Sequence, residues 1–363
     1  MPNPAHHSLQ GSLTSLSDLI ATFSDLSIPA EPAPTDKSPP PPCPIATLPS
    51  EVLVEILEYA AIADVASFVR LAQVCKRLAY LVATEDRIWK RVCCGNEVGF
   101  GAMHYDWRCD IHGAALHSNP DDNPDNHTLA APPSPTTRTT PTPPPPSPAP
   151  PTDPTTLTIL HKTYASSWLR MFRTRPRIRF NGCYISTVNY VRPGASSPTQ
   201  ISWNTPVHIV TYYRYLRFFR DGSALSLLTT AEPADVVHHL TRENAHSRHT
   251  AAFPAVAVMN SALRGRWRLS GPGAGTGENV GADVDSEAEA EGDLHVETEG
   301  VDAKYMYKLQ LTLRSAGRGA KNNKLTWRGF WSYNKLTDDW APFALKNDRA
   351  FFWSRVRSYG VGE

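Results

Sequence analysis

Residues 44–94 constrain the fold of this chain more than any other stretch. The segment opens with Leu48-Pro49, and proline fits the first turn of a helix because its missing N–H would have no intrahelical partner there. Glu51 and Glu55 lie near the N-terminal end of that helix, where the helix dipole favours acids. Apolar residues recur at three- and four-residue spacing, which predicts an amphipathic helix. These residues are Val52, Leu53, Ile56, Leu57 and Tyr59.

Two more apolar series follow this helix. The second runs from Val65 to Val82 and is interrupted by basic residues, and the third ends on Ile88, Trp89 and Val92. Three short helices in about fifty residues bury little surface, and domains of this size are marginal and often depend on a partner. We therefore predict a three-helix module that binds another protein. A plain three-helix bundle without a partner is the alternative.

The order of residues in this module resembles the F-box, the helical module by which SCF-type ubiquitin ligases hold their substrate receptors. The match includes the Leu-Pro start and the later Val74-Cys75-Lys76-Arg77 series. The resemblance implies that the segment binds a Skp-type adaptor, which joins it to cullin and RING subunits. It also implies that some of the following residues form or support the adaptor contact, while others belong to the helix core: Leu48, Pro49, Leu53, Ile56, Leu57, Val74, Cys75 and Trp89.

Composition limits the other possibilities. A length of 363 residues predicts about two domains, and 33 prolines place much of the chain outside any core. A formal net charge of +1 provides no overall field to attract nucleic acid or a membrane. We recognise no signal peptide, no stretch long enough to span a bilayer and no paired cysteine framework. We expect a soluble protein of the reducing cytoplasm, with the nucleus as a second location.

Several segments are predicted to lie outside the folded domains. Residues 1–43 are expected to be mostly disordered, with a short amphipathic helix near 12–27 that either folds back on the F-box or binds another protein. A connecting segment spans 95–117. Residues 118–156 are rich in proline and threonine, and such a segment cannot bury enough apolar surface to offset its ordering entropy. We predict a disordered insert there.

Five potential metal ligands, Cys93, Cys94, His104, Cys109 and His112, lie in and after the third helical series. A structural zinc site needs four nitrogen or sulfur ligands. However, the adjacent cysteines make a poor knuckle, and the other residues supply only one half-site without standard paired spacing. We expect buried free cysteines here, with no metal and no cofactor.

The apolar period changes from helical to alternating after residue 176. Residues 157–176 predict a helix that leads into the second domain. Alternating β-branched and aromatic runs follow, and Asp221-Gly222 supplies the positive φ angles of a tight hairpin turn. Few helical patterns separate these runs, which favours an antiparallel sheet of about eight strands, closed or nearly closed, over βαβ units. The predicted fold class is α+β, with an F-box followed by a β-barrel-like domain over residues 177–363.

Two details of this domain follow from its pattern. Residues 305–314 alternate strictly, so Leu309, Leu311 and Leu313 are expected on one apolar face. Residues 271–303 are rich in glycine and acids. We predict a disordered acidic insert there, with a short strand near residues 294–296 in the run LHVET.

A second resemblance covers most of the remaining ordered chain. The blocks RPRIRFNGCYIS, YYRYLRFFRDG and FFWSRVRSY are similar in sequence and order to the C-terminal domain of the F-box only protein 9 family, including its fungal counterparts. Animal members carry a helical repeat region before the F-box, and this chain has only residues 1–43 there, so functions of that region are not carried over. The resemblance implies a non-catalytic substrate receptor whose β domain holds a target protein.

Other function classes find little support. Hydrolase, nucleotide-binding and zincin motifs are absent, and His238-His239 has no evident serine or cysteine partner. The run from Arg214 to Arg220 places basic and aromatic residues on both faces of a strand, which argues against a nucleic-acid surface. Two alternatives to a ligase receptor stay open. One is a small-ligand carrier built on the barrel, and the other is an adaptor-bound scaffold outside any ligase.

Overall fold

The computed structural model describes residues 44–116, 159–160, 162–193, 207–246, 257–271, 290–317 and 320–362. The chain forms two compact units. The helical unit comprises Met1–Val98 and Thr155–Arg173, and the β unit comprises Gly99–Pro154 and Thr174–Glu363. The predictions for residues 1–43 and 118–156 lie outside the described residues. No described helix is long and apolar enough to cross a membrane.

The helical unit is built from short helices that begin and end at identifiable residues. Helix α2 ends at Asp64, whose backbone is extended (φ −158°, ψ 102°). The Asp64 side chain caps α3, because its carboxylate accepts hydrogen bonds from the Ala66 N–H (3.2 Å) and the Ser67 hydroxyl (2.7 Å). The second predicted series divides at Cys75, which is extended (φ −154°, ψ 164°). The helices are α2 (Ser50–Ala63), α3 (Val65–Arg70), α4 (Lys76–Thr84), α5 (Asp86–Cys94) and α7 (Trp168–Thr174), with 3-10 turns at Pro44–Thr47 and Leu71–Gln73.

The core of the helical unit joins two distant parts of the sequence. The Trp89 ring lies 5.6 Å from the Phe68 ring and 5.6 Å from the Phe172 ring of α7, and its indole N–H donates to the Val82 carbonyl at 2.7 Å. The Cys93 thiol donates to the Trp168 carbonyl at 3.3 Å. The helix that we predicted as an entry to the second domain therefore contributes α7 to the core of the first.

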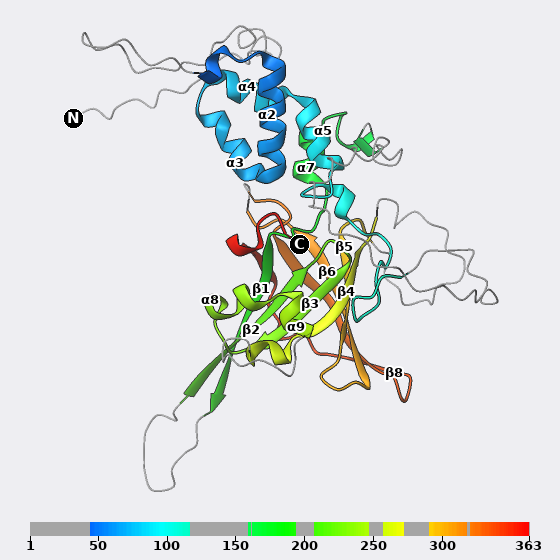
Figure 1. Cartoon of the computed structure of the whole chain (residues 1–363). Helices are drawn as coiled ribbons and strands as arrows, with labels where there is room; N and C mark the ends of the chain where they lie inside the picture. Colours follow the sequence, from blue (N-terminus) through cyan, green and yellow to red (C-terminus); the bar gives the residue numbers. More distant parts are fainter. Residues whose placement is uncertain are drawn as a thin grey trace, which may run out of the picture. The chain divides into compact units, whose positions relative to one another are not determined.

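The β unit is an antiparallel barrel of eight strands with one added strand at its edge. Neighbouring strands pair in the order β1-β2-β3-β4-β5-β6-β7-β9, and the β1–β9 and β6–β7 pairings close the cylinder (Figure 1). The predicted closed antiparallel sheet is confirmed. The strands are β1 (Gly182–Pro193), β2 (Val207–Phe218), β3 (Ser223–Thr229), β4 (Leu263–Leu269), β5 (Asp293–Glu299), β6 (Tyr305–Arg314), β7 (Lys324–Asn334), β8 (Asp339–Pro342) and β9 (Phe351–Arg355).

Large side chains fill the barrel interior at the end where β1 begins. The Trp267 ring lies 5.9 Å from each of the Phe180 and Phe218 rings, and its indole N–H donates to the Phe219 carbonyl at 2.9 Å. Leu309, Leu311 and Leu313 of β6 are buried, as their alternation predicts. The other fully buried residues of this layer are Tyr184, Leu216, Leu294, Val296, Leu325 and Phe351.

Short helices cover the outer face of β2 and β3 (Figure 1). They are α8 (Pro233–Val236), α9 (Arg242–His246) and the 3-10 turns Val237–His239 and Val258–Ser261. Tyr215 of β2, Phe219 just after β2, and Leu225 and Leu227 of β3 pack there with Val236 and Leu240. Because both faces of β2 are covered, Arg217 is also buried, and its guanidinium donates to the Leu240 carbonyl at 2.6 Å.

Two strands differ from the sequence-based expectation. The predicted acidic insert 271–303 contains β5, which is longer than the short strand expected at 294–296 and lies between β4 and β6. Its acidic residues are paired with arginines, since Arg266 contacts Glu297 at 2.7 Å and Arg328 contacts Asp293. The short strand β8 was not predicted. It pairs only with β7, which leaves its outer edge open among the described strands.

Candidate functional site

The helix α2 presents apolar side chains on two sides. Leu53 and Leu57 are buried, with exposed fractions of 0% and 2%. Val52, Ile56 and Tyr59 are exposed to 43%, 44% and 65%, and their spacing of four and three residues places them on one face of the helix. Exposed apolar side chains aligned in this way are typical of a protein-binding surface.

The structure divides the eight predicted site residues into two groups. Leu53, Leu57 and Trp89 lie in the core, where they hold the helices in place. Ile56 and Val74 are exposed to 44% and 66%. The remaining three residues are accessible to different degrees: Pro49 is exposed, and Leu48 and Cys75 are half-buried.

Four exposed apolar residues of the helical unit were not among the predicted site residues: Ile45, Val52, Tyr59 and Val69. For Val52 and Tyr59 the signal was present in the sequence, because α2 has more apolar positions than one buried face can use. We define the exposed face of α2 (Val52, Ile56 and Tyr59), together with Ile45, Val69 and Val74, as the apolar surface of the helical unit.

Arg77 fixes the turn that begins α2. Its guanidinium donates to the Ser50 hydroxyl at 3.1 Å and contacts the Leu48 carbonyl at 3.5 Å. These bonds tie α4 to the Leu48-Pro49 turn across 29 residues of sequence. Arg77 therefore positions the first turn of the helix that carries half of the residues of the apolar surface.

The five potential metal ligands have other surroundings. Cys93 is bonded within the helical unit, whereas His104, Cys109 and His112 belong to the β unit. His104 donates to the Arg220 carbonyl and lies 5.2 Å from the Trp267 ring, and burial lowers its pKa. Within the described residues no three histidine, cysteine or acidic side chains are grouped as metal ligands.

Burial also determines which thiols can react. It raises the pKa of Cys183 to about 12 and that of Cys109 to about 11, so at pH 8 only about one molecule in a thousand or fewer carries either thiolate. We expect iodoacetamide to modify the half-buried Cys75 well before these two cysteines, as measured by mass spectrometry over time. Labelling in denaturant should remove the difference, and equal rates in the native protein would contradict the prediction.

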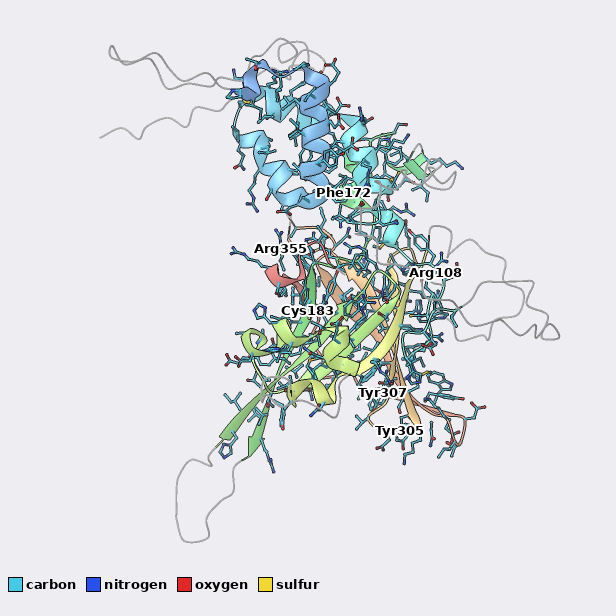
Figure 2. All side chains as sticks on the ribbon, viewed as in Figure 1. Arg108, Phe172, Cys183, Tyr305, Tyr307 and Arg355 are labelled. Carbon is cyan, nitrogen blue, oxygen red and sulfur yellow. The ribbon has the colours of Figure 1, made fainter. Side chains whose placement is uncertain are left out.

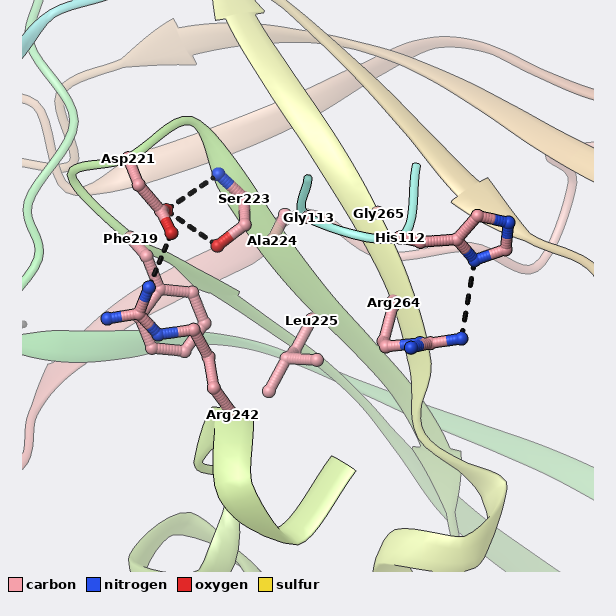
Figure 3. A pocket seen from close by; sticks show the side chains of 10 residues that line it. All are labelled: His112, Gly113, Phe219, Asp221, Ser223, Ala224, Leu225, Arg242, Arg264 and Gly265. Carbon is pink, nitrogen blue, oxygen red and sulfur yellow. Dashed lines mark hydrogen bonds and ion pairs between the residues drawn. The ribbon is translucent and has the colours of Figure 1, made fainter. Parts of the chain in front are cut away.

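One small pocket of about 120 Å³ lies on the outer face of β3 and β4. Its charged walls are already paired: Arg242 contacts Asp221, and Arg264 contacts Glu299 at 2.6 Å. Figure 3 shows Asp221 also bonded to Ser223, and His112 bonded to Arg264. Because these charged side chains have protein partners, nothing in the pocket requires a ligand.

His238 has a partner that sequence analysis missed. Its ring Nδ1 lies 3.1 Å from the Ser358 hydroxyl, a residue 120 positions away in the sequence. A serine–histidine nucleophile also needs a group that orients the histidine. Among the described residues no carboxylate hydrogen-bonds to His238, so this exposed pair lacks the third member of a catalytic triad.

Two family models match this chain, one over each of its two parts. The family described as the F-box only protein C-terminal region matches residues 157–339, half of the chain's 363 residues. The chain belongs to the F-box only protein family. A second family, described as F-box-like, matches residues 45–95, which include the apolar surface. The predicted family resemblance is therefore confirmed for both parts of this F-box protein.

Two curated relatives are similar over about half of this F-box protein. F-box protein pof7 of Schizosaccharomyces pombe is 32% identical over 201 residues, covering 55% of this chain and 47% of that protein. F-box protein HRT3 of Saccharomyces cerevisiae is 33% identical over 193 residues, covering 52% and 46%. The chain thus spans about half the length of the relatives it matches. No solved structure matches it.

Proposed function

We propose that this F-box protein is a non-catalytic substrate receptor of an SCF-type ubiquitin ligase. The observation that carries the proposal is the exposed apolar face of α2 within the matched F-box. The helical unit binds a Skp-type adaptor through this surface and is linked through it to cullin and RING subunits. The β unit binds the target, and tethering raises the effective concentration of target lysines near the conjugating enzyme.

The role needs no nucleophile on this chain. Other ligase subunits carry out ubiquitin transfer, so the receptor contributes only binding. The target's identity, its ubiquitination and its degradation belong to the proposal, as do the expected locations in cytoplasm and nucleus. The alternative of a small-ligand carrier is disfavoured by the layer around Trp267, because buried side chains fill the space that a carrier of this size would need.

Adaptor binding tests the proposal directly. We expect the wild-type chain to co-elute with its Skp-type adaptor, and the double variant Val52→Asp/Ile56→Asp to lose at least about tenfold in affinity, because each change buries a charge in an apolar contact. Calorimetry measures the affinities. Since both residues are exposed, the variant should keep its helical circular dichroism.

Leu336→Asp is the matched control, because Leu336 is 79% exposed on the β unit. It should bind the adaptor as the wild type does. A folded wild type that does not bind the adaptor would overturn the proposal. If adaptor binding is retained but cullin does not co-purify, the scaffold alternative is favoured.

A further inference from the structure

The barrel wall is incomplete between β1 and β7. Strand β9 pairs with β1 only from Gly182 to Ile185, and with β7 only at Lys324 and Leu325. Among the described strands, the rest of β1, from Ser186 to Pro193, pairs only with β2. The barrel therefore has an open strand edge at the end where Tyr307 lies, which is the end away from Cys183 in Figure 2.

Arg214 of β2 points into the barrel near this opening. Its guanidinium carbon lies 5.2 Å from the Trp327 ring and 5.0 Å from the Phe330 ring. Both rings belong to β7, which is not a neighbour of β2 in the sheet, so the contact crosses the interior. The Arg214 side chain is only 13% exposed. The opening thus contains a nearly buried cation between aromatic rings.

Arg214 has fewer partners than a buried guanidinium requires. A guanidinium carries five N–H donors, yet the Arg214 guanidinium donates no hydrogen bond to another described residue, and its Nε is buried without a partner. Within the described part of the chain its one ion pair is with Asp348, at 3.4 Å. Burial lowers its pKa, which reflects the cost of keeping this charge away from water. Acceptor oxygens better placed than those of Asp348 would stabilise it.

Asp348 belongs to residues 343–350, which connect β8 to β9 and which we call the strap. The strap crosses the opening. The Arg349 carbonyl accepts from the Ser186 hydroxyl of β1 (2.7 Å) and from the Trp327 indole of β7 (3.0 Å). At its other end the Phe343 ring stacks on the Phe330 ring at 4.3 Å. A backbone carbonyl, an aromatic ring and one carboxylate thus hold the strap in place.

We propose that this opening binds an extended segment of the target protein that carries an acidic side chain, and that the strap occupies the same site in the free chain. The acidic group replaces Asp348 at Arg214. Bidentate bonds from arginine to a carboxylate or phosphate are stronger than the present ion pair. This inference rests on the proposed receptor function, because it assigns the substrate-binding part of the β unit.

The surroundings suit an extended segment. The strap is held partly by the backbone carbonyl of Arg349, which accepts hydrogen bonds from Ser186 and Trp327. Any bound peptide has backbone carbonyls that could accept the same bonds. The open edge of β1 can add a strand, a common mode of peptide recognition. Next to it the paired residues Val191 and Ile209 are exposed to 64% and 71%, which provides apolar contact area beyond the acidic group.

The test uses a peptide with the strap's own sequence, FALKNDRA, and the full-length variant Asp348→Asn, whose strap lacks the carboxylate. Fluorescence anisotropy measures binding of the labelled peptide and of versions with Glu, phosphoserine or Asn at the Asp position. We expect the acidic versions to bind Asp348→Asn about tenfold or more tightly than the Asn version. The wild type should bind them less tightly, because its tethered strap competes.

The double variant Arg214→Gln/Asp348→Asn should bind the acidic and Asn peptides equally. Arg314→Gln/Asp348→Asn is the matched control, since Arg314 is exposed on β6, and it should keep the preference. If Asp348→Asn does not fold, Asp348→Ser, which removes the same carboxylate, replaces it in the peptide-binding experiment. A Glu preference over phosphoserine identifies a carboxylate ligand, and the reverse identifies a phosphate; either supports an acidic segment.

Equal binding of acidic and Asn peptides to folded Asp348→Asn, or no binding of any peptide, would overturn the inference. Adaptor co-elution is measured on the same samples. Loss of adaptor binding with the acidic preference retained would contradict the receptor function alone. Adaptor binding without an acidic preference would contradict only this site.

Discussion

Changing both Leu53 and Leu57 to alanine is expected to unfold the helical unit. Both side chains are buried in it, at 0% and 2% exposure. Each buried Leu→Ala change costs about 2.7–5 kcal/mol, so the pair costs about 5–10 kcal/mol, which is comparable with the whole stability of a small domain. Thermal melting followed by helical circular dichroism measures the effect. Adaptor binding will be lost through unfolding and not through a lost contact.

The control is Val52→Ala/Ile56→Ala on the same helix. Both residues are about half exposed, so truncation should change the free energy of unfolding by only about 1 kcal/mol or less. Adaptor affinity should nevertheless fall. If instead the Leu53/Leu57 variant stays folded and loses the adaptor, these leucines contact the partner directly and the assignment of core and surface on α2 is reversed.

Trp267→Ala should have the largest effect of a single change in the β unit. The indole packs between Phe180 and Phe218, and its N–H satisfies the Phe219 carbonyl. Removing a buried tryptophan costs about 3–5 kcal/mol, because a cavity is left inside the barrel. Denaturant titration measures the loss as a lower unfolding midpoint at unchanged slope.

Trp340→Ala is the matched control for this change. Trp340 lies on β8 and is 48% exposed, and its ring lies 4.7 Å from the tilted Tyr333 ring. Its removal should cost about 1 kcal/mol or less. If Trp267→Ala shifts the midpoint no more than Trp340→Ala does, the layer around Trp267 does not hold the barrel together.

The barrel was largely predictable because its signals are local. Alternation in β6 and the Asp221-Gly222 turn each act within a few residues. The length of β5 was underestimated, because its acidic residues suggested an exposed insert. The arginines that neutralise these acids lie on β4 and β7, more than 25 residues away in the sequence. The four-residue strand β8, with Pro342 at its end, has too little alternation to be recognised.

The candidate surface was only partly predictable for a different reason. The periodicity of α2 identifies its apolar positions, but packing decides which of them are buried. That packing involves α5 and, through Trp89 and Phe172, a helix beyond residue 160. Sequence spacing therefore could not separate Leu53 and Leu57 from Ile56. The site at Arg214 was missed because its contacts join β2 to β7 across the barrel.

The two units are interleaved along the chain. The helical unit takes residues on both sides of a segment that the β unit uses, since His104 and Tyr105 contact the β unit before α7 returns to the helices. A single backbone cut within residues 117–158 would leave two fragments, and each would supply part of both folds. The fragments should therefore remain associated, and an F-box fragment ending at Val98 would lack the Phe172 ring that packs on Trp89.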